Sequence, residues 1–138
     1  MATYVVGDIQ ITDPAAYQTH VPRALATIAR FGGRVIAGGA DWQIVRADGL
    51  AELDTRYTLE TDDGKLIYVQ NPGIRHAPPE VTAKLMAGQP VDPSLVYFRT
   101  APRFETSAPE FAWLMRSIFV GTGERHPADV VLRFWKLG

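Results

Sequence analysis

The stretch LAELDTRYTLE, residues 50–60, decides the fold class because apolar and polar side chains alternate along it. Successive side chains of a β-strand point to opposite faces, so one face carries Ala51, Leu53, Thr55, Tyr57 and Leu59. The other face carries Glu52, Asp54, Arg56, Thr58 and Glu60. Asp62-Asp63-Gly64 follows as a hairpin turn, and Lys65–Gln70 is expected to return as the partner strand. The stretch therefore predicts an antiparallel hairpin whose two faces differ in polarity.

The rest of the second part of the chain predicts further short strands separated by turns, as in a meander or barrel. Asn71–Pro79 is expected to be a loop because it is rich in proline and glycine, and Pro79–Ala87 a short helix. Asp48-Gly49 and Gly121-Thr122-Gly123 are expected to be turns. The predicted strands are Asp41–Val45, Leu95–Phe104, Phe111–Val120 and Val130–Leu137.

The first 36 residues predict a strand–helix–strand unit. Thr3–Ile11 is typical of a strand, and Asp13-Pro14 of the start of a helix. Gly32-Gly33 is expected to end that helix before a second strand at Arg34–Ala37. Residues 1–138 are expected to form a single domain, with an N-terminal unit at 1–36 and an antiparallel portion at 37–138. The predicted class is α+β, mainly antiparallel β.

Composition excludes several classes of protein. Fourteen Lys and Arg against fifteen Asp and Glu give a net charge of -1, without the basic excess of a nucleic-acid binder. The absence of cysteine excludes disulfides, thiol nucleophiles and thiolate metal sites. The three histidines lack metal-ligand spacing, so we expect no metal and no cofactor. No apolar run is long enough to span a membrane and no leader precedes the first strand, which favours a cytoplasmic protein.

Asp54 and Arg56 form the predicted catalytic pair. They are two residues apart on one strand and share a face, about 6.6 Å apart at ~3.3 Å per residue. Arginine can hold an enolate or anionic oxygen while the carboxylate acts as a base. His76 is a further candidate acid or base, because it lies in the predicted loop and titrates near neutrality. The alternative is that this face is a solvated outer surface with weak ion pairs.

The predicted substrate-binding residues are polar or aromatic side chains on the expected strands and turns. Asp41 and Trp42 follow two glycines and could form the lip of a pocket. Tyr97 and Arg99 share one face of a predicted strand, and they are pocket donors only if that face is the interior. Tyr57, Tyr68 and Trp113 are candidates for the aromatic lining, with packing as the alternative for each.

The chain resembles two uncharacterised families. From about residue 38 to 137 it is similar to the domain of unknown function 3237 family of bacteria and fungi. The matching segments are Gly38–Gln43, Glu52–Tyr57, Tyr97–Thr100, Phe104–Thr106, Trp113-Leu114 and Ile118–Gly121, with Pro102 and Gly123. This resemblance implies a calycin-type, lipocalin-like barrel, or a strongly curved sheet, with a central pocket.

Residues 1–36 are similar instead to the start of the domain of unknown function 1330 family, on Tyr4–Val6, Asp13-Pro14, Tyr17 and Phe31–Arg34. That resemblance implies a ferredoxin-like, dimeric α+β fold. This unit stands where two long barrel strands are expected, so either its first strand and Arg34–Ala37 complete the barrel differently or a second chain closes it. A homodimer is the expected assembly, because an open sheet edge favours pairing.

Three functions follow from these observations as hypotheses. The first is an isomerase, cyclase or hydratase that uses acid–base chemistry on a carbonyl-bearing hydrophobic or aromatic molecule in the barrel pocket. The second is a protein that binds a hydrophobic small molecule without turnover. The third, from the N-terminal resemblance, is a dimeric α+β barrel enzyme related to oxygenases.

Overall fold

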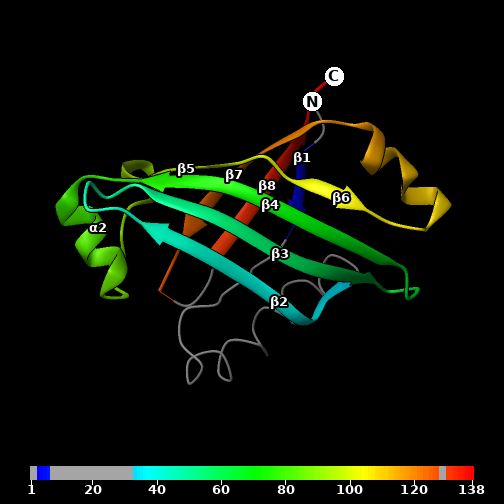
Figure 1. The fold of residues 1–138 in the computed structure, drawn as a ribbon, viewed down its shortest axis with the longest axis horizontal. Helices are drawn as coiled ribbons and strands as arrows, with labels where there is room; N and C mark the ends of the chain where they lie inside the picture. The colour runs from blue at the N-terminus through cyan, green and yellow to red at the C-terminus, as the bar shows by residue number, and fades with distance from the viewer. Residues whose placement is uncertain (1–2, 7–32, 128–129) are drawn as a thin grey trace.

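The protein is built on one curved antiparallel sheet. A computed structural model describes residues 3–6, 33–127 and 130–138, with the surroundings of side chains from residue 35 onward. The strand order is β1-β8-β7-β5-β4-β3-β2, with β6 paired to β4, and every pairing is antiparallel. Figure 1 shows the strands curving around a common interior. The strands are β1 (Thr3–Val6), β2 (Gly33–Val45), β3 (Ala51–Thr61), β4 (Leu66–His76), β5 (Tyr97–Thr100), β6 (Arg103–Glu105), β7 (Phe119–Arg125) and β8 (Val130–Lys136).

The helices of the described ranges are short. Helix α2 (Pro79–Met86) lies where the sequence predicts it, buries Val81 and Leu85, and is followed by Gly88 at φ 68°. Two 3₁₀ helices, η1 (Pro93–Leu95) and η2 (Pro109–Arg116), connect strands. None of the helices in these ranges combines the length and apolarity needed to cross a membrane. The predicted helix after Asp13 falls outside the described residues.

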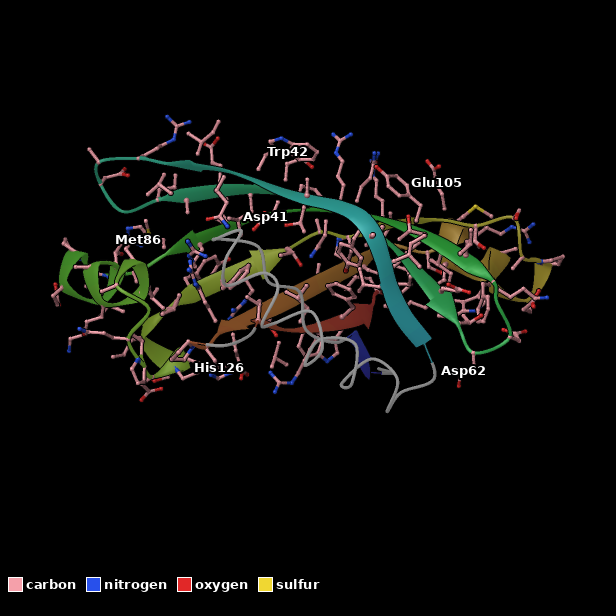
Figure 2. All side chains as sticks on the ribbon, turned by 90° about the horizontal axis from the view of Figure 1, so that it is seen from below. Asp41, Trp42, Asp62, Met86, Glu105 and His126 are labelled. Atoms are coloured by element: carbon pink, nitrogen blue, oxygen red, sulfur yellow. The ribbon has the colours of Figure 1, made fainter. Side chains whose placement is uncertain are left out.

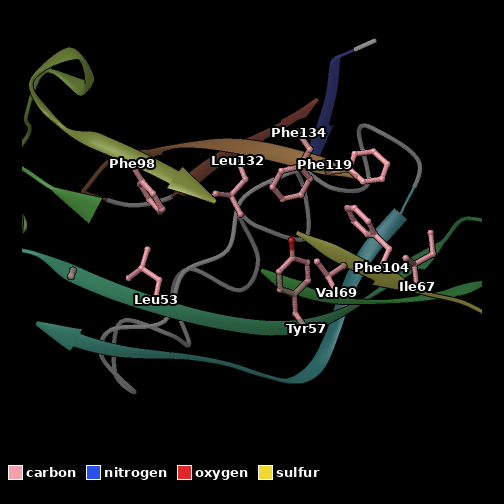
Figure 3. Close-up of a cluster of buried hydrophobic side chains, with 10 residues drawn as sticks. Leu53, Tyr57, Ile67, Val69, Phe98, Phe104, Phe119, Leu132 and Phe134 are labelled. Carbon is pink, nitrogen blue, oxygen red and sulfur yellow. The ribbon is translucent and has the colours of Figure 1, made fainter. Parts of the chain in front are cut away.

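The alternation along β3 decides which side of the sheet is the interior. Ala51, Leu53 and Tyr57 are buried, whereas Glu52, Asp54 and Arg56 of the opposite face reach the outer surface. Leu53 and Tyr57 point toward Phe98 and Leu132 of distant strands, as Figure 3 shows. The sheet thus has a concave face that carries the core and a convex face in solvent. Ring pairs such as Phe104–Phe119, 5.0 Å apart and edge to face, fill one end of the interior.

Strand β2 is longer than predicted because two expected strands are continuous. Arg34–Ala37 and Asp41–Val45 join through Gly38 and Gly39, and the register with β3 shifts between Ile36 and Ala40. The two glycines form a β-bulge, and Gly38 has a φ of 106°, which favours glycine.

Strand β4 continues through part of the predicted loop Asn71–Pro79, and this prediction is wrong as far as His76. The proline is tolerated because of its position. Pro72 lies between the pairing with β6, at residues 68–70, and the pairing with β5, at residues 73–76. Its missing N–H therefore interrupts no ladder on that side, and its carbonyl accepts a 2.9 Å hydrogen bond from Ala101 N.

Three predictions for the last third of the chain are wrong. Leu95–Phe104 is divided into β5 and β6 at Ala101-Pro102. Phe111–Val120 is not one strand, since η2 occupies its first part and packs Phe111, Trp113 and Leu114 on the core. Gly121-Thr122-Gly123 lies inside β7 and is not a turn.

Candidate functional site

Polar side chains gather on the concave face near one end of the sheet. Asp41 and Gln43 come from β2, Thr55 from β3 and Arg75 from β4. Arg125 of β7 lies on the same face, because it is two residues beyond Gly123, which faces the Phe98 ring, and the charge of Asp41 acts on both arginines. We call these five residues the concave polar cluster.

Asp41 is the acceptor at the centre of the concave polar cluster. Thr55 Oγ1 donates to Asp41 Oδ1 at 2.8 Å, and Gln43 Nε2 donates to Asp41 Oδ2 at 2.6 Å. Thr55 lies directly opposite Asp41 in the register, and Gln43 lies two residues along β2 on the same face. The carboxylate is therefore held in one orientation by two neutral donors.

Arg75 and Arg125 are the cations of the concave polar cluster. Arg75 is only 6% exposed and donates to Gln43 Oε1 at 3.3 Å. Burial lowers the pKa of Arg75 to about 10, with a further contribution from the positive charge of Arg125. Burial also lowers the pKa of Arg125, which the charge of Asp41 partly opposes. Arg75 is thus a buried cation, whereas Arg125 is partly buried.

Arg75 borders two apolar surfaces. Its guanidinium carbon lies 5.9 Å from the centre of the Phe98 ring. On its other side it lines a narrow hollow under α2 whose walls include Ala51, Leu85 and Met86. The hollow is too small for a ligand larger than about one water molecule. Arg75 is therefore enclosed on both sides.

Among the residues that the structure describes, three buried polar atoms on the concave face have no hydrogen-bond partner. They are Tyr57 Oη, Asn71 Oδ1 and Thr100 Oγ1. Asn71 lies opposite Thr55 in the β3–β4 register, and Thr100 lies opposite Gly73 in the β4–β5 register. The three residues thus occupy neighbouring positions on three adjacent strands, next to the concave polar cluster.

The predicted catalytic pair lies on the convex face. Arg56 Nη2 and Asp54 Oδ2 form a 3.0 Å ion pair, and both side chains are 45% exposed. Hydrogen bonding to Asp54 and its negative charge raise the pKa of Arg56. His76, at the end of β4, is also exposed. The structure brings Asp54 and Arg56 together, but it places none of these three residues in the concave polar cluster.

Of the predicted substrate-binding residues, Asp41 and Tyr57 face the interior. Figure 2 shows Asp41 on the inner side of β2 and Trp42 on its outer side. Trp42 is 58% exposed and lies 5.9 Å from the Arg56 guanidinium carbon.

The remaining predicted residues lie elsewhere. Arg99 stacks on the exposed Tyr97, with its guanidinium carbon 4.9 Å from the ring centre. Tyr68 pairs with Thr58 on the convex face of β3 and β4. Trp113 packs against Phe119 at 6.0 Å.

Five residues of this region were not predicted as site residues from the sequence: Arg75, Arg125, Gln43, Asn71 and Thr100. Arg75 and Asn71 fell in the predicted loop, where strand alternation could not be applied, and Arg125 follows residues that were expected to form a turn. Thr55 carried a signal, because it is a polar residue on the face that also carries Leu53 and Tyr57.

Sequence comparison places this chain in a known family. The sequence model described as "Protein of unknown function (DUF3237)" matches residues 12–137. The chain belongs to the DUF3237 family. The match begins within residues 1–36, whose resemblance to the domain of unknown function 1330 family stays a prediction and falls mostly outside the described residues.

Similar proteins are named as uncharacterised. A UPF0311 protein of Rhodopseudomonas palustris (strain TIE-1) is 52% identical over 100 residues, which are 72% of this chain and 65% of that protein. A UPF0311 protein of Clostridium acetobutylicum is 48% identical over 107 residues, or 78% of this chain and 68% of that protein. The chain thus spans about two thirds of the length of these DUF3237 relatives.

Solved structures show the same fold. The crystal structure of a conserved protein of unknown function from Rhodopseudomonas palustris has a TM-score of 0.73 and 50% identity, covering 75% of this chain and 70% of that one. A beta-barrel like protein from Acinetobacter baumannii AYE has a TM-score of 0.64 and 46% identity, covering 77% of this chain and 68% of that one. The DUF3237 chain described here therefore has a strongly curved, beta-barrel-like antiparallel fold.

Proposed function

We propose that this protein binds a small, largely apolar molecule on the concave face of its sheet, in the manner of a calycin-type barrel. Ligand sites in proteins are concave and mostly apolar, with a few polar groups that orient the ligand. The concave face has this composition, since Leu53, Phe98 and Leu132 line it beside the concave polar cluster.

The unpartnered atoms of Tyr57, Asn71 and Thr100 carry this proposal. Buried polar groups in folded proteins are nearly always hydrogen-bonded, and an unsatisfied one costs about 1–3 kcal/mol. Three unsatisfied polar groups on adjacent strands therefore favour a bound ligand that supplies the missing hydrogen-bond partners. A ligand with a polar group on an apolar body fits both the unpartnered atoms and the apolar wall.

Acid–base chemistry on a carbonyl-bearing substrate is the second candidate function, and the arrangement around Asp41 favours it. Asp41 supplies on the concave face the carboxylate that was expected from Asp54, and Arg75 supplies the guanidinium expected from Arg56. In this version Asp41 is the base and Arg75 holds the developing oxyanion. Asp41→Asn would then abolish turnover of a bound substrate while leaving its binding within a few-fold.

The test of the binding function is to look for a bound molecule and then to remove one unpartnered group. Native mass spectrometry of protein purified without denaturation is expected to show a non-covalent adduct of small-molecule mass. Tyr57→Phe removes the buried hydroxyl and is expected to weaken the adduct by about 10-fold, the effect of one hydrogen bond.

Tyr68→Phe is the matched control, because Tyr68 lies on the convex face of the neighbouring strand. It is expected to leave the adduct unchanged. Equal effects of the two substitutions, or a protein with no adduct and no response to any fragment of a broad small-molecule screen, would contradict the binding function.

A further inference from the structure

We infer that the ligand of the concave site is an organic carboxylate, held by the guanidinium groups of Arg75 and Arg125. This inference rests on the function proposed above and names its ligand class. It follows from the charges, the open donors and the enclosure of the concave polar cluster.

The charge balance of the concave polar cluster favours an anion. It contains two cations, Arg75 and Arg125, and one anion, Asp41. The two positive charges repel each other, and the burial of Arg75 reduces the screening of this repulsion by water. An added negative charge would offset this repulsion and leave the site neutral.

Asp41 does not occupy the donors of the two arginines. Its oxygens accept from Thr55 and Gln43, and no ion pair within 4.0 Å joins it to either arginine in the described ranges. Arg75 makes one side-chain hydrogen bond, to Gln43. The Arg125 guanidinium makes no hydrogen bond with another residue that the structure describes. A guanidinium has five N–H donors, so most donors of this pair stay open.

The geometry of a guanidinium suits a carboxylate. Its planar fork can donate two parallel hydrogen bonds to the two carboxylate oxygens, and such charge-assisted bonds are about twice as strong as neutral ones. Low polarity around the pair strengthens them further. Phe98 supplies that low polarity at 5.9 Å from Arg75, and the buried Leu53 and Leu132 belong to the same apolar cluster.

The test uses matched pairs of probes that differ in charge alone. Benzoate is compared with benzamide, phenylacetate with phenylacetamide, and hexanoate with hexanamide, each up to 10 mM at pH 7.5 and constant ionic strength. Binding is measured by protein-observed NMR. We expect each acid to bind at least about 10-fold more tightly than its amide, because the amide lacks the charge.

Arg125→Gln is expected to weaken acid binding by about 10- to 100-fold, the factor for a lost hydrogen bond to a charged group, and to leave amide binding unchanged. Arg103→Gln, on an exposed residue of β6, is the matched control and is expected to change neither. The thermal midpoint and NMR spectrum of each variant establish that it is folded.

Each other outcome overturns the inference in a recognisable way. Amides that bind as tightly as the acids would contradict the inference that the ligand is an anion, and so would an Arg125→Gln variant with unchanged acid binding. Neither result would contradict the proposed binding function. Inorganic phosphate that binds more tightly than any acid would replace the carboxylate by a different anion. If no compound of either series bound at 10 mM, the carboxylate inference and the binding function would both fail.

Discussion

At Arg75 the stability of the fold and the proposed ligand binding make opposite demands. Folding disfavours a buried charge, whereas the proposed binding of an anion needs that charge. Keeping a cation 6% exposed in a mostly apolar interior costs free energy, and its pKa is lowered to about 10 as a consequence. Its single side-chain hydrogen bond, to Gln43 at 3.3 Å, offsets little of that cost. A ligand anion would offset much more, and this is a reason for the binding role proposed for Arg75.

Arg75→Lys is expected to make acid binding dependent on pH near neutrality. A lysine ordinarily has a pKa of ~10.4, and burial and Arg125 would lower it in this position, with Asp41 as the opposing charge. Benzoate affinity of the variant should therefore fall as pH rises between about 7 and 9. The wild-type affinity should stay level there and fall only as pH rises through about 10.

Stability of the same variant should change in the opposite direction. The folded chain binds the lysine proton less tightly than the unfolded chain, so the free energy of unfolding rises with pH over that range. Calorimetric titration with benzoate and urea unfolding at pH 6, 7, 8 and 9 measure the two effects, with Arg103→Lys as control. A variant whose benzoate affinity is level across this range would contradict the assignment of Arg75 to the site.

Asp54→Asn is expected to have little effect on stability or ligand binding. Asp54 and Arg56 are half-exposed on the convex face, where ion pairs are weak and screened by salt. We expect the thermal midpoint to shift by less than about 2 °C and benzoate affinity to stay within two-fold. Asp41→Asn is the matched substitution on the concave face, and it is expected to change benzoate affinity by a few-fold because it removes a negative charge near Arg75 and Arg125. A large loss of ligand binding in the Asp54→Asn variant would indicate that the ligand binds on the convex face.

At the scale of elements, β7 shows how glycine opens room for the interior. A Cβ at Gly123 would lie 2.4 Å from the Phe98 ring, and one at Gly121 would lie 2.3 Å from Thr100 Oγ1 and 2.7 Å from Phe134. The lack of a side chain at both glycines lets the neighbouring side chains pack directly against the β7 backbone. Phe98 in turn lies beside Arg75, which links the glycines to the site.

Gly123→Ala is expected to lower the free energy of unfolding by about 1–3 kcal/mol, the usual cost of overpacking a core. The added methyl must displace the Phe98 ring, so acid affinity should fall as well. Thr122→Ala, at the next position of β7 on the opposite face, is the control. Urea unfolding monitored by tryptophan fluorescence measures both variants, and equal stability of Gly123→Ala and the wild type would show that Phe98 relaxes freely.

At the scale of the whole molecule, the described sheet has two edges, β1 and β2. The convex face next to the β2 edge carries large exposed apolar side chains among charged ones. Trp42 and Ile44 on β2 are 58% and 61% exposed, and Ile74 on β4 is 41% exposed. In the register, Ile44 and Ile74 both lie opposite Glu52, so they flank it. Contiguous exposed apolar surface is typical of protein–protein contacts.

We expect the protein to form a homodimer through this surface, with twice the 15.2 kDa chain mass in light scattering. Trp42→Glu combined with Ile44→Glu should shift it to the monomer, because two charges would be buried in the contact. Leu66→Glu, at an exposed position far along β4, is the control. A wild-type protein that is monomeric at ~100 µM, well above a micromolar dissociation constant, would contradict the expectation.

The sequence by itself determined the antiparallel class, the hairpin from β3 to β4, the helix α2, and which β3 residues share a face. These features follow from local rules: side chains alternate along a strand, and Asp62-Asp63-Gly64 forms a tight turn in any context. Family resemblance over the second part of the chain was also evident from short motifs, and the family match confirms it.

Only the tertiary structure decided which face is the interior, and with it the site. Alternation separates Thr55 and Tyr57 from Asp54 and Arg56, but the direction in which the sheet curves depends on strands far along the chain. Pro72 and the β7 glycines were mistaken for loop and turn signals because their fit depends on β5, β6 and Phe98. Arg75 and Arg125 come within electrostatic range of Asp41 only when β2, β4 and β7 curve around one interior, since residues so distant in sequence are brought together by packing.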